Sequence, residues 1–437
     1  MVLAVAAVVL QFCGGGLVGE GDDGDRAAPP IDAADLVATD PVGVEDLTAD
    51  QRAQLDQFIA QATADLEGFW VEAYPAAYGG EYTPLTDAAP TFPTRGPVAC
   101  ESPVSVVHNA LYCAAGDFVT WDGEELFPNL ATNFGLGAIA AVLAHEWGHA
   151  VQSPVRHDFE GATITRELQA DCFAGAWFGG RVASGGGAGL SLDTRDMDGA
   201  IAALLLLRDS FGAGYGDPRA DGSGFDRVRA FADGERDGVH RCAGYEADGI
   251  SLVDVPLATG EAQDRSLAEA VESVTDHLPV FFADHVELGQ QLYDPSRRQP
   301  NPCPAPTIGP VSLCEDTATV VGDAAQLRHL HDRIGDFSAA LLFAAEWGRA
   351  VAISRGITEE ASIDLMGECL AGAWAGEVAA APETGVVLAP GDLDEALATL
   401  LRFGRGSAAG SAVLRSDMVQ LGFLDGPEAC FELNTPE

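Results

Sequence analysis

The chain has 437 residues, which is enough for two or three domains that each bury a core of their own. Its residues are 47% hydrophobic and 21% charged, a balance that is typical of folded proteins and excludes a largely disordered chain. The formal net charge is -44 and all 23 basic residues are arginine, so we exclude nucleic acid and anionic lipid surfaces as partners.

Residues 1–18 are an apolar run without a basic leading segment or a small-residue cleavage site, so they do not form a standard signal peptide. Their length is close to the roughly 20 residues that one membrane span needs. We interpret the run as a membrane anchor or signal-anchor remnant, with a buried core segment as the alternative. Residues 19–45 are rich in Asp, Gly, Ala and Pro and predict a flexible acidic linker. We therefore expect the protein on the extracytoplasmic side of a cell membrane, or secreted.

A small β-hairpin is expected before the first long helix. The segment Phe118-Val-Thr-Trp121 alternates in polarity and consists of residues that favour strands. This segment has two interpretations: an exposed edge that pairs with an extended peptide, or a strand of the core. A disulfide between Cys100 and Cys113 would close a local hairpin here.

The next predicted element is an amphipathic helix. Its apolar residues recur at three- and four-residue steps: Leu136, Ile139, Leu143 and Trp147. His145 and His149 are four residues apart, so they project from one face of the helix and can reach the same metal ion. Glu146 completes an H-E-x-x-H arrangement, in which the glutamate acts as a general base. The alternative is a pair of solvated histidines without a metal.

A second helix follows, with small and apolar residues at four-residue steps: Ile164, Leu168, Cys172 and Ala176. Glu167 and Asp171 share one face of it. A catalytic zinc takes three protein ligands and keeps one position open for water. We therefore predict Glu167 as the third ligand and Asp171 as the acceptor of a hydrogen bond from a histidine ring. A solvated pair of surface acids is the alternative.

The two helices together resemble the neutral zinc metallopeptidases of bacteria and, more broadly, the gluzincins. The resemblance is carried by His145-Glu-Trp-Gly-His-Ala-Val-Gln152 and Glu167-Leu-Gln-Ala-Asp-Cys-Phe-Ala-Gly-Ala-Trp177, with weaker likeness in Asn109-Ala-Leu-Tyr-Cys113 and Arg227-Val-Arg-Ala-Phe231. It covers roughly residues 47–255. The resemblance implies zinc as cofactor, with three ligands: His145, His149 and Glu167. It also implies a zincin-like α+β fold that is mostly helical.

The expected function is zinc-dependent hydrolysis of peptide bonds. Zinc lowers the pKa of its water to about 7, and Glu146 accepts a proton as the water attacks and passes it to the leaving amine. The donor that stabilises the oxyanion has no spacing signal among the available side chains: Tyr112, His157, Arg166 and His240. Two alternatives remain: a non-catalytic scaffold that binds peptide or envelope material through a structural zinc, and a zinc hydrolase of a cell-wall amide. The presence of Glu146 argues against the scaffold, because a structural zinc site needs no base.

The cysteines reveal an internal repeat. With Cys13 set aside, they fall into two similarly spaced groups of four: Cys100, Cys113, Cys172 and Cys242, then Cys303, Cys314, Cys369 and Cys430. Cys172-Phe-Ala-Gly-Ala-Trp177 also recurs as Cys369-Leu-Ala-Gly-Ala-Trp374, and Asp233-Gly234 matches Asp425-Gly426. We predict a metallopeptidase domain over 46–255 and a second copy over 262–437.

Even numbers of cysteines in each copy favour disulfides and an oxidising compartment. Four cysteines allow three pairings. We prefer the pairing in which the short pair closes a local hairpin: Cys100–Cys113 and Cys172–Cys242, repeated in the second copy as Cys303–Cys314 and Cys369–Cys430.

The second copy has lost the expected metal ligands. Their positions hold three other residues: Ala345, Arg349 and Asp364. Glu346 keeps the place of Glu146, and Glu368 replaces Asp171. We predict a pseudoenzyme domain without zinc, in which Arg349 forms an internal ion pair with Glu346 and Asp364.

Overall fold

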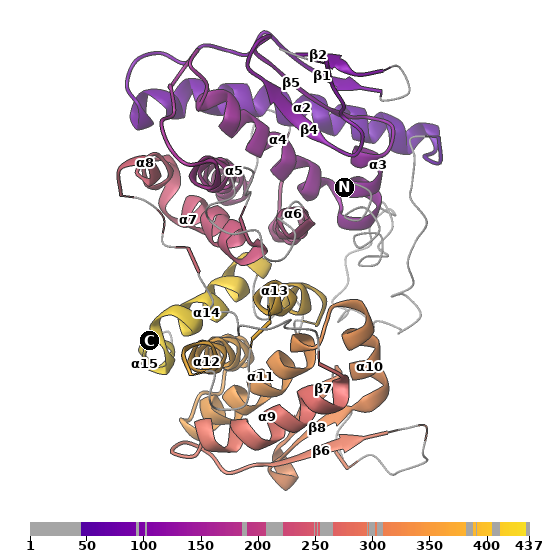
Figure 1. The fold of residues 1–437 in the computed structure, drawn as a ribbon, viewed down its shortest axis with the longest axis vertical. Coiled ribbons are helices and arrows are strands. Elements are labelled where there is room, and N and C mark those ends of the chain that lie inside the picture. The colour runs from indigo at the N-terminus through magenta and orange to yellow at the C-terminus, as the bar shows by residue number, and fades with distance from the viewer. Residues whose placement is uncertain are drawn as a thin grey trace. The chain divides into compact units, whose positions relative to one another are not determined.

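The computed structural model describes residues 45–92, 96–100, 103–185, 190–206, 222–248, 250, 252–253, 265–294, 296, 302–303, 309–381, 388–389, 391–403 and 411–433. The predicted anchor and nearly all of the predicted linker lie outside these residues. The described chain is α+β and mostly helical, with three small sheets. It divides into two compact units, the first ending at Leu252 and the second beginning at Val253 (Figure 1).

The first unit contains, in chain order, α2 (Ala49–Ala77), β1 (Asp87–Thr91), β2 (Val98–Ala99), β3 (Pro103–Val104), β4 (Ala110–Cys113), β5 (Phe118–Asp122), α3 (Leu126–Phe134), α4 (Leu136–Val151), α5 (Thr163–Ser184), α6 (Thr194–Leu206), α7 (Gly224–Ala243) and α8 (Tyr245–Asp248). A capping box of Thr48 and Gln51 starts α2. Helix α4 is the centre of the unit: it packs against α2, α3 and the sheet, and also against α5 and α6 (Figure 1).

The three-stranded sheet of this unit has the order β1-β5-β4, with β1 parallel and β4 antiparallel to β5. Strand β5 is therefore the central strand, and four of its five residues are buried. Of the two interpretations of Phe118–Trp121, the core strand is confirmed and the exposed edge is wrong, because β1 pairs with the side of β5 that β4 leaves free. The edges of this sheet are β1 and β4.

Two glycines allow α5 to pack closely against α4 on one side and against α7 on the other. A Cβ atom on Gly148 of α4 would lie 2.8 Å from the Cα of Ala170 of α5, so only glycine allows this approach. On the far side of α5, a Cβ on Gly175 would lie 1.9 Å from the carbonyl oxygen of Phe231 in α7. Helices packed at such short distance hold their side chains in fixed register, which is what a site shared between α4 and α5 requires.

The second unit contains α9 (Leu267–Phe281), β6 (Gly289–Tyr293), β7 (Val311–Cys314), the 3-10 helix η4 (Glu315–Thr317), β8 (Thr319–Asp323), α10 (Ala324–Arg333), α11 (Phe337–Ser354), α12 (Glu360–Ala380), α13 (Asp392–Phe403), α14 (Ala412–Asp425) and α15 (Pro427–Glu432). Its sheet has the order β6-β8-β7, again with one parallel and one antiparallel pair. A capping box of Ser266 and Glu269 starts α9. Apart from the β2–β3 ribbon of the first unit and η4 of the second, the described elements of the two units follow the same order.

One sequence match between the units needs correction. A Cβ on Gly234 of α7 would lie 1.8 Å from the carbonyl oxygen of Cys172, and a Cβ on Gly422 of α14 would lie 1.8 Å from that of Cys369. Gly422 is therefore the counterpart of Gly234. Gly426, which the sequence match chose, has φ of 79° and ends α14. The Asp-Gly pair at 425–426 resembled Asp233-Gly234 only by composition.

The described chain forms four disulfides: Cys100–Cys113, Cys172–Cys242, Cys303–Cys314 and Cys369–Cys430. These are the preferred pairs, and such bonds are typical of proteins from oxidising compartments. The first does not close a hairpin of the three-stranded sheet, because Cys100 follows β2 and Cys113 ends β4. It ties the short β2–β3 ribbon to that sheet instead.

Among the described residues, α11 alone is long and apolar enough to cross a membrane, with a mean hydropathy of 1.2. However, 78% of that window is buried inside the protein. It packs against α9, α10, α12 and α13 as the core helix of the second unit.

Candidate metal centre

The structure brings the three predicted zinc ligands together between α4 and α5. The ligand atoms of His145, His149 and Glu167 all lie within 4.8 Å of one another. Glu167 Oε2 is 3.3 Å from His145 Nε2 and 3.1 Å from His149 Nε2. His145 is 6% exposed, and the side chains of His149 and Glu167 are 18% and 17% exposed. The cluster therefore lies at the wall of the unit, within reach of solvent.

Asp171 lies at hydrogen-bond distance from Nδ1 of His145, as predicted. His145 Nδ1 is 2.7 Å from Asp171 Oδ1. Arg227 donates to both oxygens of the same carboxylate, from Nε and from Nη2, each over 2.8 Å. Burial raises the pKa of Asp171, but Arg227 and His145 outweigh burial and keep the pKa below its usual value. An ionised Asp171 accepts a hydrogen bond from Nδ1–H, which leaves Nε2 of the neutral His145 ring with its lone pair facing Glu167.

The second histidine is oriented by an amide. His149 Nδ1 is 2.9 Å from Gln152 Oε1, which can only accept a hydrogen bond. Nε2 of His149 therefore also presents a lone pair to Glu167. Neither Gln152 nor Arg227 was singled out from the sequence as part of the site. Arg227 sits in a segment of the resemblance, but nothing in the spacing connects it to Asp171.

Three electron-pair donors thus converge on one point and repel one another unless a positive charge lies between them. In the metal-free chain, protons meet that demand. Burial lowers the pKa of His145, but Asp171 and Glu167 outweigh burial and raise that pKa to about 10. Burial raises the pKa of Glu167, yet the two histidines hold it well below its usual value. Two imidazole nitrogens and one carboxylate are the donor set of a catalytic zinc, so the residues present fit that ion.

Glu146 lies next to His145 on α4 and is 7% exposed. A cavity of about 360 Å³ opens beside the cluster. Its lining comes from the end of β4, from the turn after α4 and from the start of α5: Tyr112, Ala114, His149, Gln152, Ser153, Pro154, Asp158, Arg166 and Glu167. Two of the predicted ligands thus border a space large enough for part of a substrate.

The structure narrows the candidates for an oxyanion donor. Tyr112 and Arg166 line the cavity, whereas His157 and His240 do not. The hydroxyl of Tyr112 donates to Asp117 Oδ1 over 2.8 Å, so its proton is already engaged. His157 pairs with Glu246 over 2.8 Å, and His240 is exposed on α7. Arg166 is the remaining candidate that lines the cavity, and its Nη2 donates to the carbonyl oxygen of Phe159 over 3.4 Å.

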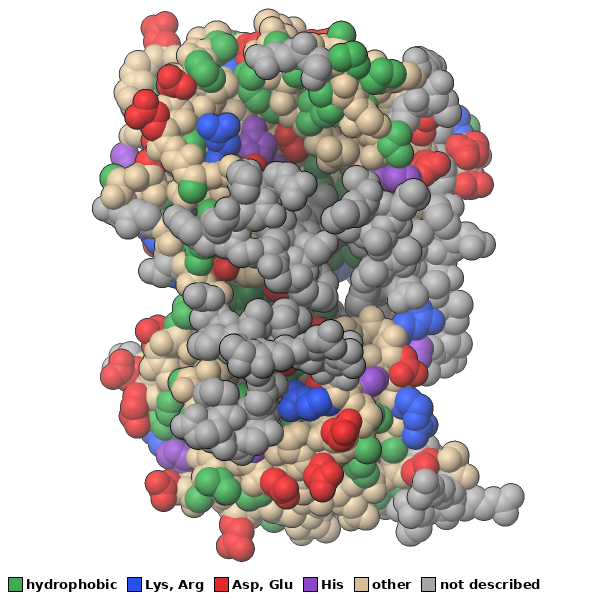
Figure 2. Space-filling model, in the orientation of Figure 1, with side chains coloured by type: hydrophobic (Ala, Val, Ile, Leu, Met, Phe, Trp, Pro, Cys, Tyr) green, Lys and Arg blue, Asp and Glu red, His purple; other side chains and the backbone are tan. Residues whose placement is uncertain are grey.

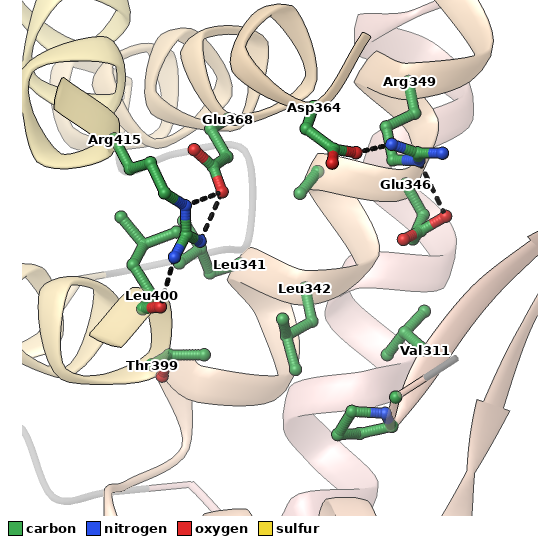
Figure 3. Close-up of a pocket in the computed structure, with 13 residues that line it drawn as sticks. Val311, Leu341, Leu342, Glu346, Arg349, Asp364, Glu368, Thr399, Leu400 and Arg415 are labelled. Carbon is green, nitrogen blue, oxygen red and sulfur yellow. Dashed lines mark hydrogen bonds and ion pairs between the residues drawn. The ribbon is translucent and has the colours of Figure 1, made fainter. Parts of the chain in front are cut away.

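In the second unit, Arg349 forms the expected ion pairs with Glu346 and Asp364 (Figure 3). Arg349 contacts Asp364, its Nε lies 3.5 Å from Glu346 Oε2, and its Nη2 lies 2.8 Å from Glu360 Oε1. Glu360 was not foreseen. Glu346, the counterpart of Glu146, also accepts a hydrogen bond of 2.8 Å from the backbone N–H of Leu313 in β7. The cavity at this position has only about 40 Å³.

Each unit contains a buried pair of a carboxylate and a guanidinium group. Arg415 donates from Nε to Glu368 Oε1 over 2.8 Å, and from Nη1 to the carbonyl oxygen of Leu400 over 2.7 Å (Figure 3). This pair repeats Arg227 and Asp171 of the first unit, although the histidine that Asp171 serves is Ala345 in the second. The carboxylate–guanidinium pair is thus compatible with the fold alone.

Three buried acids form another close group, in the second unit: Asp336, Asp392 and Glu395. Arg265 Nε lies 2.9 Å from Asp336 Oδ2, and the backbone N–H of Phe337, at the start of α11, donates to Glu395 Oε2 over 2.9 Å. Carboxylates at a helix N-terminus accept hydrogen bonds from its unpaired N–H groups and interact favourably with the helix dipole. Glu395 thus caps α11, Asp336 is paired with Arg265, and Asp392 accepts a hydrogen bond of 2.8 Å from the backbone N–H of Ala389 before α13.

On the face shown in Figure 2, red acidic side chains are scattered over the described surface of both units, with blue basic side chains interspersed. No protein-family model, curated protein or solved structure matches the chain. We therefore infer the function from the geometry of the site.

Proposed function

We propose that the first unit hydrolyses peptide bonds with the help of zinc. The observation that carries this proposal is the convergence of three electron-pair donors beside a cavity, with Glu146 as the neighbouring carboxylate. Asp171 and Gln152 orient the two histidines by hydrogen bonds to their Nδ1 atoms, as is usual for the histidine ligands of a metal site. Oxidised cysteines in both units support a location outside the cytoplasm.

Each site residue has a separate role in the proposed reaction. His145, His149 and Glu167 would hold the zinc. When bound, zinc supplies a Lewis acid that polarises the scissile carbonyl and acidifies water. Glu146 accepts the proton of the attacking water and delivers it to the leaving amine. The cavity next to His149 and Glu167 receives part of the peptide, and Arg166 at its rim is the candidate donor to the oxyanion.

We further propose that both units are zincin-like, belong to the neutral zinc metallopeptidases that the motifs resemble, and are tandem copies of one domain. The shared sheet order, capping boxes and disulfide pattern support this proposal. The second copy is then a pseudopeptidase, in which Arg349 supplies the positive charge that zinc supplies in the first. The N-terminal apolar run would anchor both copies to a membrane.

The test is hydrolysis by the zinc-loaded full chain, with a denatured protein and a cell-wall preparation offered side by side. Glu146→Gln should bind zinc normally and lose at least about 100-fold in peptide hydrolysis, the scale of a general base. Glu346→Gln, the same change in the second unit, is the matched control and should retain full activity. If the chain hydrolyses only the cell-wall amide, its activity is that of an amidase and not of a peptidase. Equal activity of Glu146→Gln and the wild type would contradict the mechanism.

A further inference from the structure

We infer that Gln152 and Gln169 form a relay of hydrogen bonds that positions His149 for the metal. The inference rests on the proposed zinc centre and assigns a role to two glutamines that lie within the motifs but were given no role from the sequence. Both side chains are buried, at 2% and 0% exposed. Buried amides at hydrogen-bond distance from a predicted ligand require an account of where each donor and acceptor goes.

The orientation of the Gln152 amide follows from its neighbours. Its Nε2 lies 2.8 Å from the carbonyl oxygen of Arg166 and 2.8 Å from Gln169 Oε1. A main-chain carbonyl oxygen can only accept, so the NH2 group of Gln152 must face it. The Oε1 atom is then the one that faces His149 Nδ1, at 2.9 Å.

Gln169 is oriented in the same way. Its Nε2 lies 3.0 Å from the carbonyl oxygen of Cys242 and 3.2 Å from Glu246 Oε1, and both of these oxygens accept. Its own Oε1 must therefore face the NH2 group of Gln152. Because Cys242 is bonded to Cys172 of α5, the carbonyl that anchors the relay is fixed to the same helix that carries Glu167.

The relay selects one tautomer of His149. If the ring proton were on Nε2, that N–H would donate to Glu167 Oε2, 3.1 Å away, and Nε2 would have no lone pair for the metal. In that state the Nδ1 lone pair would face the lone pairs of Gln152 Oε1, an unfavourable contact inside the protein. Of the two neutral tautomers of His149, the relay thus penalises the one that carries its proton on Nε2, the nitrogen that would bind the metal.

The second unit shows that the glutamines are not required for the fold. At the positions of Gln152 and Gln169 it has Ala352 and Met366. It forms the same succession of helices, with Arg349 in the place of His149. The relay is absent where the histidine is absent, whereas the pair of Glu368 and Arg415 persists there. This contrast assigns the glutamines to the metal site.

The experiment measures the zinc affinity of the full chain by competition with a chromogenic chelator. Gln152→Met keeps the length of the side chain but removes its acceptor, and should weaken zinc binding about 10- to 100-fold. Gln152→Glu keeps an acceptor for His149 Nδ1 but has no donors for Arg166 and Gln169. It should bind zinc within a few-fold of the wild type while the zinc-free chain unfolds more easily. Gln420→Met, at a buried glutamine of the second unit, is the control and should leave zinc affinity unchanged.

The outcomes separate the relay from the zinc centre. A wild type that binds no zinc overturns the proposed function and the relay with it. A wild type that binds zinc no better than Gln152→Met overturns the relay alone. Equal losses in Gln152→Met and Gln152→Glu would also overturn it, because the acceptor to Nδ1 would then be irrelevant. In the zinc-loaded wild type, NMR should find the His149 ring proton on Nδ1, protected from exchange, and Gln152→Met should lose that protection.

Discussion

Replacing Asp171 with asparagine perturbs both the fold and the metal site, and the structure separates the two effects. Asp171 is 0% exposed and Arg227 is 2% exposed, so Asp171→Asn leaves a buried guanidinium without its counter-ion. Breaking a buried pair in this way costs about 3–5 kcal/mol of stability. His145 loses a charged acceptor at Nδ1, which should weaken zinc binding by about 10- to 100-fold.

Glu368→Gln offers a matched control, because Glu368 and Arg415 form the same buried pair in the unit without metal ligands. Both variants should have a lower free energy of unfolding in denaturant. Hydrogen exchange should locate the loss of stability in the first unit for Asp171→Asn and in the second unit for Glu368→Gln. Only Asp171→Asn should lose zinc affinity, measured by chelator competition under conditions where the chain is folded. The reasoning is refuted if both variants bind zinc as the wild type does, or if Asp171→Asn unfolds as the wild type does.

Three further predictions concern other parts of the chain. Burial raises the pKa of Glu67, so the fold favours its protonated form and that stabilisation is lost as the pH rises through the folded pKa. Glu67→Gln should therefore be more stable relative to the wild type at about pH 7 than at about pH 4, as measured by the free energy of unfolding. A difference in unfolding free energy that is the same at both pH values would contradict this prediction. Gly148→Ala should push α4 from α5, because its Cβ would lie 2.8 Å from Ala170 Cα, and should cost about 1–3 kcal/mol and some zinc affinity. Gly180→Ala, which has open space around it, should be tolerated, and equal effects of the two would contradict the packing argument. Arg349→Met should destabilise the second unit by about 3–5 kcal/mol without changing the zinc content, because its buried acidic neighbours lose their cation.

The site helices could be predicted because their signals are local. The apolar stripe of α4 and the four-residue step from His145 to His149 are properties of one helix, and so is the step from Glu167 to Asp171 on α5. Such periodicity places side chains on a face without knowledge of the rest of the fold. The role of Asp171 also followed, because a buried acid near two histidines needs a hydrogen-bond donor.

The supporting contacts could not be predicted, because they join segments that are distant in the sequence. Arg227 reaches Asp171 only through the packing of α7 on α5, and Gln152 meets Gln169 only because α4 and α5 approach at Gly148. The central position of β5 likewise depends on β1, whose parallel pairing leaves no pattern in either strand. A signal for Arg227 existed in the repeat, since Arg415 holds the corresponding place. It becomes visible only when the units are aligned through their glycine contacts.

The most direct test of the account is the zinc content of the purified full chain with its disulfides formed. We expect about one zinc per chain in the wild type, as a three-ligand site predicts, and little in His149→Ala. Because the second unit has no predicted zinc ligands, Arg349→Ala should leave this content unchanged. A wild-type chain that retains no zinc, even after zinc is added, would contradict the central claim and leave the convergence of His145, His149 and Glu167 without a function.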